Sequence, residues 1–294
     1  MIFDYQFRNY NFRALIYMIL LSVLGILVVG SASNQDRSSV IKQIIGVVVS
    51  LIICLVLSLI DYHQYFRFTT LIYVVCAGML AAVLLFGRTT KGATRWLRIG
   101  GIQIQPSEFV KIGLILILAN FLSRNRDKIN EPKTLGMTAL ICVLPVGMVY
   151  LQPNLSTTIV ICFMILCMVY VAGISYKWIA GAVAVGVPGF AALIYLSLQG
   201  FIPFLQKYQA QRIMGKIFHS SSEFTDLNRQ QDNSMMAIGS GQLRGKGLFN
   251  NTLSSVKNGN FLSEEQTDFI FAVIGEELGF VGGVAVIALY ALLV

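Results

Sequence analysis

The sequence predicts an all-α integral membrane protein, a polytopic helical bundle with one large polar loop before its last span. Hydrophobic residues make up 56% of the 294 residues and charged residues only 12%. A soluble domain is nearer half apolar and a quarter charged. The mean hydropathy is +0.72, and apolar runs long enough to cross a bilayer recur along the chain. A bundle of membrane-spanning helices accounts for these observations together.

The charge and cysteine content exclude several other classes. A net charge of +8 would suggest nucleic acid in a soluble protein. No basic run here alternates with an aromatic stacking platform, so we expect loops that face anionic membrane lipids and no nucleic-acid partner. The five cysteines lie inside apolar runs without a CxxC pair, and the two histidines are isolated. We therefore expect neither a disulfide framework nor a metal site made of cysteine or histidine.

Apolar runs define the predicted spans in chain order. They cover residues 14–31, 44–60, 68–86, 109–122, 135–151, 155–171, 178–198 and 280–294. The first has a longer apolar core than the h-region of a secretion signal and further spans follow it, so we expect an uncleaved anchor. The fourth run is short for a span. Pro145 and Pro188 lie inside the fifth and seventh runs, where they predict kinks.

Lysines and arginines in the short loops predict that the N-terminus lies inside. The strongest inside marker is SRNRDKINEPK at 123–133. The loop at 87–101, GRTTKGATRWLRIGG, then lies outside although it carries four cations. A reversed orientation would move 123–133 outside and would be no improvement. We interpret the outer cations as an anion-binding set.

Residues 200–267 form the large extracytoplasmic loop of what we expect to be a single transmembrane domain over 1–294. The loop is too long for a simple connection and too polar for a span, which favours a functional role. It contains GSGQLRGKG at 239–247, where backbone N–H groups and Lys246 could cradle a phosphate. A flexible loop is the alternative, because the strand-turn-helix setting of known phosphate loops is absent.

Two short motifs place polar side chains beside apolar helices. In QPSEFVKIG, Glu108 and Lys111 are three residues apart and share one helix face. They are either a structural ion pair or part of a site, and at membrane depth a functional site is the default hypothesis. In QPNLST, Asn154 suits a turn followed by a helix N-cap. The sequence has no GxSxG or HExxH motif to support a hydrolase.

Asp268 begins the final apolar segment in QTDFIFAVIGEELG, residues 266–279. Asp268 either stabilises the N-terminus of the helix through its interaction with the helix macrodipole, or serves as a general base at a boundary between water and apolar surroundings. Ala272, Gly275 and Gly279 follow on nearly the same helical face. This stripe of small residues would let another helix or a ligand chain approach closely.

Glu276 and Glu277 lie deeper in the same segment. Being adjacent, they cannot face the same way, and a carboxylate at membrane depth needs a partner or a task. We expect at least one of them to pair with a lysine or arginine.

Four segments occur in an order that resembles one family. They are GATRWLRIGGIQIQPSEFVKIG, YQAQRI, AIGSGQLRGKGL and QTDFIFAVIGEELGFVG. Together they resemble the SEDS family (shape, elongation, division and sporulation), the RodA, FtsW and SpoVE type membrane proteins of bacteria. The resemblance runs from about the first span to the last residue. Family members usually have ten spans, so this chain, with about eight, is short at its C-terminal side.

The resemblance implies a peptidoglycan glycosyltransferase of the bacterial plasma membrane, acting in elongation, division or sporulation. Such proteins polymerise lipid II outside the membrane and work with a class B penicillin-binding protein, a transpeptidase. The family's proposed catalytic aspartate corresponds to Asp268. Positions thought to line the central cavity correspond to Arg95, Trp96, Glu108, Lys111 and, in YQxxRI, Arg212. Asn154 stands where the family's QPDLGT has a carboxylate, which leaves more weight on Asp268.

The implied chemistry is an inverting transfer with release of undecaprenyl pyrophosphate. Arg95, Arg98 and Arg212 could neutralise the leaving group, and the small-residue stripe could receive the polyprenyl tail. A divalent cation, Mg²⁺ or Mn²⁺, could assist, although the sequence offers no dedicated cage. The alternatives are a lipid II flippase, which the kinked helices would suit, and a non-catalytic scaffold for the transpeptidase.

Overall fold

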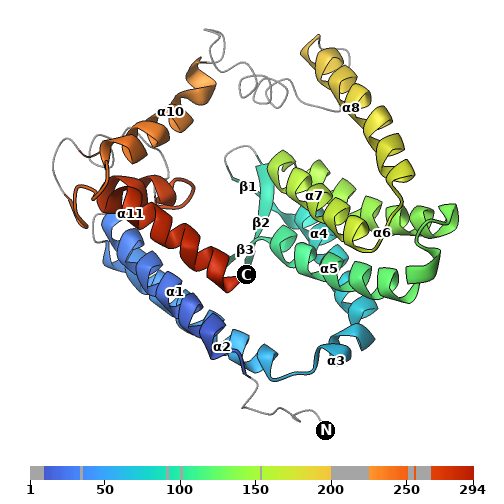
Figure 1. The fold of residues 1–294 in the computed structure, drawn as a ribbon, viewed down its shortest axis with the longest axis horizontal. Helices are drawn as coiled ribbons and strands as arrows, with labels where there is room; N and C mark the ends of the chain where they lie inside the picture. Colours follow the sequence, from blue (N-terminus) through green and yellow to red (C-terminus); the bar gives the residue numbers. More distant parts are fainter. Residues whose placement is uncertain are drawn as a thin grey trace. The chain divides into compact units, whose positions relative to one another are not determined.

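The computed structural model describes residues 10–33, 36–90, 93–99, 102–152, 154–199, 225–250, 255 and 266–294. Helices dominate these residues, with one small sheet (Figure 1). The contacts divide the chain into two compact units, one formed by 1–60 with 210–294 and the other by 61–209. Each unit has its own core.

Helices confirm the predicted membrane bundle. Within the described residues, seven helices are long and apolar enough to cross a membrane. They are α1 (Phe12–Ala32), α2 (Arg37–Ser58), α4 (Thr69–Phe86), α5 (Pro106–Arg124), α6 (Pro132–Leu151), α8 (Tyr176–Leu198) and α11 (Ile270–Leu293). The apolar helix α7 (Leu155–Val171) is shorter, and α3 (Tyr62–Arg67), α10 (Thr225–Ser240) and a 3₁₀ turn at Arg126–Lys128 complete the set. Every predicted span therefore has its helix.

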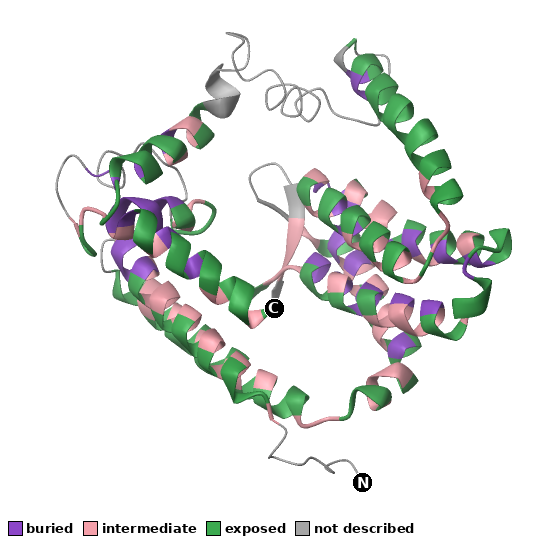
Figure 2. Cartoon of the chain, in the orientation of Figure 1, coloured by how far each residue is buried: buried purple, intermediate pink, exposed green. Residues whose placement is uncertain are grey.

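Exposed apolar side chains cover the outside of several of these helices (Figure 2). On α2, for example, no residue is buried within the described structure, although the helix is mostly aliphatic. A soluble protein does not expose apolar surface on this scale. The arrangement fits helices whose outer faces contact lipid.

The connection between α4 and α5 differs from the expected loop because it forms a small antiparallel sheet. Strands β1 (Arg88–Thr90), β2 (Ala93–Ile99) and β3 (Ile102–Ile104) pair in the order β1-β2-β3. Arg88 lies opposite Trp96, and Leu97 lies opposite Ile104. A connection of this length must satisfy its backbone donors and acceptors, and strand pairing does so locally.

In the unit formed by 61–209, helices α4, α5, α6 and α7 pack around one core. Its most buried side chains include Leu80, Leu114 and Ile161. Gly113 allows α4 close to α5, because a Cβ at that position would lie 2.8 Å from the Cys76 sulfur. Small residues at helix contacts serve this purpose in membrane bundles.

Pro145 lies inside α6, where it is buried and cannot donate a backbone hydrogen bond to the carbonyl of Ile141. The Tyr73 hydroxyl of α4 donates to that carbonyl at 2.8 Å. A neighbouring helix thus satisfies the acceptor that the proline leaves without its usual donor.

In the other unit, α1, α10 and α11 pack together, with Val28, Val273, Ile274 and Val286 in the α1–α11 core. Helix α11 starts at Ile270, ten residues before the predicted span, and has a break at Gly279, whose φ is 67° and ψ is −165°. The span predicted at 280–294 is the part of α11 after this break. Helix α10 lies within the segment expected to be a polar loop.

The Tyr73 contact gives a testable prediction. We expect Tyr73→Phe to lower the free energy of unfolding by about 0.5–2 kcal/mol, because the Ile141 carbonyl loses its donor. The measurement is denaturant unfolding of the purified protein in detergent.

The same substitution should cost less in a Pro145→Ala background, because the alanine supplies an N–H group to Ile141. Equal costs in both backgrounds would contradict the compensation between Pro145 and Tyr73.

Candidate functional site

Four backbone hydrogen bonds join the two sides of the break in α11 to the glycine-rich loop at 239–247. A helix interrupted at Gly279 loses the bonds that normally join the carbonyls of residues 276 and 277 to the N–H groups of residues 280 and 281. The N–H groups of Lys246 and Gly247 donate to the carbonyls of Glu276 and Glu277, each at 2.9 Å. The N–H groups at 280 and 281 donate in return to the carbonyls of residues 242 and 243, at 2.8 and 3.2 Å. The loop therefore repairs the break.

These hydrogen bonds occupy N–H groups that a phosphate cradle in the loop would need. The N–H of Gly245 donates to the carbonyl of Gly241 at 2.8 Å, and the next two N–H groups are held by α11. A backbone anion site needs N–H groups that point at the ligand. In this structure the N–H groups of residues 245–247 bind carbonyls of the chain itself.

Glycines allow the loop to lie directly on α11. A Cβ on Gly241 would collide with the carbonyl oxygen of Gly275, and a Cβ on Gly279 would collide with the backbone nitrogen of Gly245. Gly245 itself has a φ of 78°, which an L side chain rarely adopts. Close backbone approach thus fixes these positions as glycine.

The small-residue stripe on α11 holds another helix rather than a ligand. A Cβ on Gly275 would lie 2.9 Å from a side-chain carbon of Ile238 in α10, and Ala272 is buried with Ala237 of the same helix. The expectation that a polyprenyl tail lies along this stripe is wrong, because α10 and the loop after it cover the stripe. The alternative of a closely packed helix is what the structure contains.

Glu276 and Glu277 are almost completely buried, with exposed fractions of 2% and 1%. The Lys246 ammonium lies 2.7 Å from Oε1 of Glu276. The Ser31 hydroxyl of α1 donates to Oε1 of Glu277 at 2.5 Å, and the N–H of Phe249 lies 3.4 Å from Oε2. The two adjacent carboxylates therefore face different partners, one on the loop and one on α1.

Asp268 lies in the turn at 266–269 and is exposed. Phe269, not Asp268, is the N-cap residue of α11, and no side chain caps that helix. The carboxylate thus stands at the solvent-facing start of a segment whose next residues, from Ala272 to Glu277, are all buried. Among the acids of this segment, Asp268 is the one that solvent or a substrate can reach.

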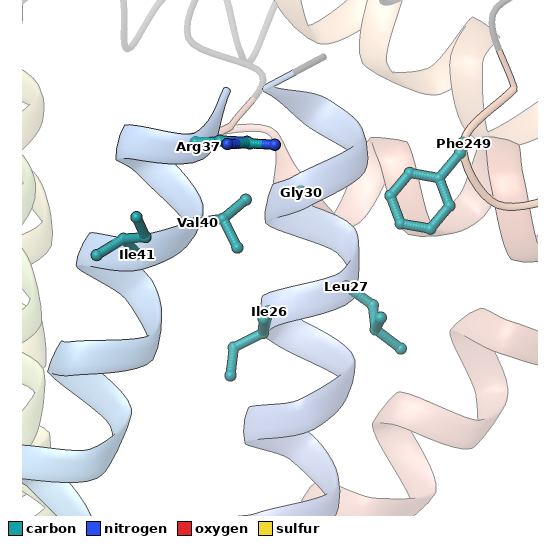
Figure 3. A pocket seen from close by; sticks show the side chains of 7 residues that line it. All are labelled: Ile26, Leu27, Gly30, Arg37, Val40, Ile41 and Phe249. Atoms are coloured by element: carbon teal, nitrogen blue, oxygen red, sulfur yellow. The ribbon is translucent and has the colours of Figure 1, made fainter. Parts of the chain in front are cut away.

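An apolar groove of about 500 Å³ lies next to this arrangement (Figure 3). Helices α1 and α2 and the end of the glycine-rich loop line it with Ile26, Leu27, Gly30, Arg37, Val40, Ile41 and Phe249. Arg37 is the charged residue of the lining. At the neighbouring Asp36, the Ser39 hydroxyl and the backbone N–H groups of Ser39 and Ser38 hold the pKa of the carboxyl below its usual value.

The remaining predicted site residues lie in the other unit. Arg95 and Trp96 are half-buried on β2, which packs against α4 and α5. On the first turn of α5, Oε2 of Glu108 lies 2.8 Å from the Lys111 ammonium. Glu108 also complements the positive end of the helix dipole. Arg98 pairs with Gln103 in the β2–β3 ladder.

Arg212 lies outside the described residues, so its predicted role stays a prediction. The structure brings Asp268, Lys246, Glu276 and Glu277 into one unit. The predicted cavity residues of β2 and α5 belong to the other unit.

Two motifs carry buried polar residues, of which only Asn154 was predicted from the sequence. Asn154 is the N-cap residue of α7 and accepts from the N–H of Thr157 at 3.4 Å. Within the described structure its Nδ2, Oε1 of Gln152 and Oγ of Ser107 are buried without a hydrogen-bond partner. Ser107 and Gln152 belong to QPSE and QPN. A polar residue next to a proline at the edge of an apolar run is the signal that could have identified them.

Metal ligands are not clustered in the part of the chain that the structure describes. There, no group of three or more histidine, cysteine, aspartate or glutamate side chains could hold an ion. The described cysteines are all free thiols.

The sequence profile of the FtsW, RodA and SpoVE family, described as a cell cycle protein, matches residues 12–294. The chain belongs to this family. It is 36% identical to peptidoglycan glycosyltransferase MrdB of Escherichia coli K12 over 281 residues, which cover 95% of this chain and 72% of that protein. It is 30% identical to the probable peptidoglycan glycosyltransferase FtsW of Haemophilus influenzae, covering 96% of this chain and 71% of that protein.

A solved structure also resembles this chain. It comes from work on polymerization and crosslinking by a peptidoglycan synthase complex. The TM-score is 0.74 at 26% identity, and the match covers 97% of this chain and 76% of that one. The fold and the family are therefore those that the resemblance implied, and the chain is a multi-pass membrane protein.

The contact between the loop and α11 gives the second prediction. We expect Gly241→Ala to lower the free energy of unfolding by about 1–3 kcal/mol, because the added methyl group collides with the Gly275 carbonyl. Thermal unfolding in detergent measures the loss.

Gly239→Ala is the matched control, because a Cβ there meets nothing within 4 Å and the residue lies in helix α10. It should leave stability unchanged or raise it by up to about 1 kcal/mol. Equal behaviour of the two variants would show that the loop does not rest on α11 as described.

Proposed function

We propose that this chain is a peptidoglycan glycosyltransferase that polymerises lipid II into glycan strands. Its family and its 36% identity to MrdB of Escherichia coli support the activity. Within the site, the observation that carries the proposal is Asp268, an exposed carboxylate at the start of a segment whose other acids are buried and paired.

The proposed reaction is a single inverting displacement. Asp268 accepts the proton of the acceptor sugar's 4-hydroxyl as that oxygen bonds to the anomeric carbon of the donor. The bond from that carbon to the pyrophosphate oxygen breaks on the opposite face, and undecaprenyl pyrophosphate leaves with its electron pair. An inverting glycosidase positions its base by the same geometric logic. Holding the two lipid substrates in line supplies much of the rate.

The paired carboxylates support Asp268 indirectly. Glu276 binds Lys246 and Glu277 binds Ser31. We therefore assign these two carboxylates a structural role, holding the loop and α1 against α11, and assign proton transfer to Asp268. We likewise assign Lys246 a structural role, because its ammonium already binds the buried carboxylate of Glu276. Rigid attachment of the segment that follows Asp268 is what a positioned base requires.

The groove between α1 and α2 is our candidate for part of the polyprenyl chain, in place of the covered stripe. Its lining is apolar apart from Arg37. We propose Arg37 as a cation for the pyrophosphate, since charge-assisted bonds to phosphate are strong. The roles of Arg95, Arg98 and Arg212 stay predictions from the sequence. In the other unit, Oε2 of Glu108 lies 2.8 Å from the Lys111 ammonium, and the role of Lys111 in substrate binding stays a prediction from the sequence.

We further propose a class B penicillin-binding protein as the partner and the bacterial plasma membrane as the location. The similar structure comes from a peptidoglycan synthase complex, which supports a synthase partner. The N-terminus is proposed to be cytoplasmic and the segment 200–267 extracytoplasmic, on the distribution of lysines and arginines. Mg²⁺ or Mn²⁺ at the pyrophosphate stays an expectation that polymerisation with and without a chelator tests.

The third prediction concerns Asp268. We expect Asp268→Asn to lower lipid II polymerisation by about 10²–10⁴-fold, because the amide cannot accept the hydroxyl proton. The measurement is glycan chain formation by the full chain in liposomes with its transpeptidase, at equal folded amounts judged by thermal unfolding.

Glu131→Gln is the control, since it also removes one exposed carboxylate, in the turn before α6. It should polymerise at the wild-type rate. Equal polymer from Asp268→Asn and the wild type would remove Asp268 from the mechanism. Movement of lipid II across the vesicle without polymer would favour a flippase, and support of the transpeptidase alone would favour a scaffold.

A further inference from the structure

A second apolar groove, of about 460 Å³, lies in the unit formed by 61–209, between the C-terminal turns of α5 and α7. Ala119 and Leu122 of α5 and Met168 of α7 line its apolar part. Leu122 and Met168 also belong to the core of this unit, so the groove has a packed floor.

One end of this groove is polar. The hydroxyl-bearing Ser123 and the guanidinium-bearing Arg126 complete the lining there, and both residues are exposed. Among the described residues Arg126 has no carboxylate within ion-pair distance. An arginine at the mouth of an apolar groove offers charge-assisted hydrogen bonds to a phosphate.

The surrounding segment adds further positive charge. Residues 123–133 contain four cations and two carboxylates. The start of α8 is tied to the same segment, because the Ser175 N–H donates to Oδ1 of Asn130 at 2.7 Å and Nε1 of Trp178 donates to the Asn130 carbonyl at 3.3 Å. These bonds bring Lys177 to this end of the unit.

Trp178 indicates that this end of the groove lies where the membrane meets water. Tryptophans gather where a membrane meets water, with the ring in the headgroup layer. Here the ring nitrogen bonds to the connection that carries Arg126. Basic pockets between membrane helices at such a boundary bind the head groups of anionic lipids.

We propose that the groove between α5 and α7 binds one anionic glycerophospholipid of the phosphatidylglycerol class. An acyl chain lies along Ala119, Leu122 and Met168, and the lipid phosphate accepts hydrogen bonds from Arg126 and Ser123. This site is independent of the proposed catalytic reaction. It is a structural lipid site on the helix group, and its test uses binding and not polymerisation.

The fourth prediction is a binding preference. Purified full chain in detergent, titrated with palmitoyl-oleoyl phosphatidylglycerol or the phosphatidylcholine of the same chains, should retain the anionic lipid more strongly in native mass spectrometry. Arg126→Gln should weaken retention of phosphatidylglycerol by about fivefold, the factor that one basic residue contributes near an anionic headgroup.

Arg124→Gln is the matched control, because Arg124 is exposed in the same segment but does not line the groove. It should leave retention within a factor of two of the wild type. Equal losses from both variants would mean diffuse attraction by the basic segment and would overturn the site. Equal retention of the two lipids by the wild type would overturn it as well.

A second measurement does not depend on an arginine variant. Cys167 lines the groove, whereas Cys162 is exposed on the same helix outside it. In single-cysteine variants, phosphatidylglycerol should slow maleimide modification of Cys167 by at least about threefold relative to phosphatidylcholine and leave Cys162 unchanged.

No difference between the cysteines would overturn the proposal, even if retention depends on Arg126. Stronger protection of Cys167 by undecaprenyl phosphate than by phosphatidylglycerol would overturn the phospholipid as occupant and assign the groove to a polyprenyl lipid.

Discussion

The break of α11 at Gly279 and its repair by the glycine-rich loop are the constraint on which the rest of its unit depends. A helix that stops and restarts leaves donors and acceptors that are costly to bury. Residues 242–247 satisfy both sides of the break by exchanging backbone bonds with residues 276, 277, 280 and 281. The loop can do so only because glycines remove the side chains that would separate the two backbones.

The positions of the buried carboxylates follow from that contact. Once the loop lies on the break, its Lys246 reaches Glu276, and the N–H of Phe249 reaches Glu277 together with Ser31 of α1. Burying two adjacent charges is tolerable because each receives hydrogen bonds or an opposite charge. The exposed Asp268 remains the acid available for chemistry in this segment. The arrangement separates the acids that hold the structure from the one proposed to react.

The same physical rule acts in the other unit. Pro145 deprives the Ile141 carbonyl of its usual donor, and the Tyr73 hydroxyl replaces it from a neighbouring helix. Backbone irregularities inside a membrane bundle persist where neighbouring protein groups satisfy them. In α6 one side chain is enough, because one bond is lost. In α11 a whole loop is needed, because the break leaves two backbone donors and two backbone acceptors without their helical partners.

The sequence by itself determined what depends on local chemistry. Hydropathy identified the spans, the spacing of three placed Glu108 beside Lys111, and the turn motif predicted the cap at Asn154. Each follows from neighbours within a few residues. Only the tertiary structure decided that the stripe at Gly275 holds α10, that the loop's N–H groups serve α11, and that Ser31 meets Glu277 across 246 positions of sequence. Those outcomes depend on which surfaces meet, because a small-residue stripe or a glycine loop fits a ligand and a helix equally well until packing selects one.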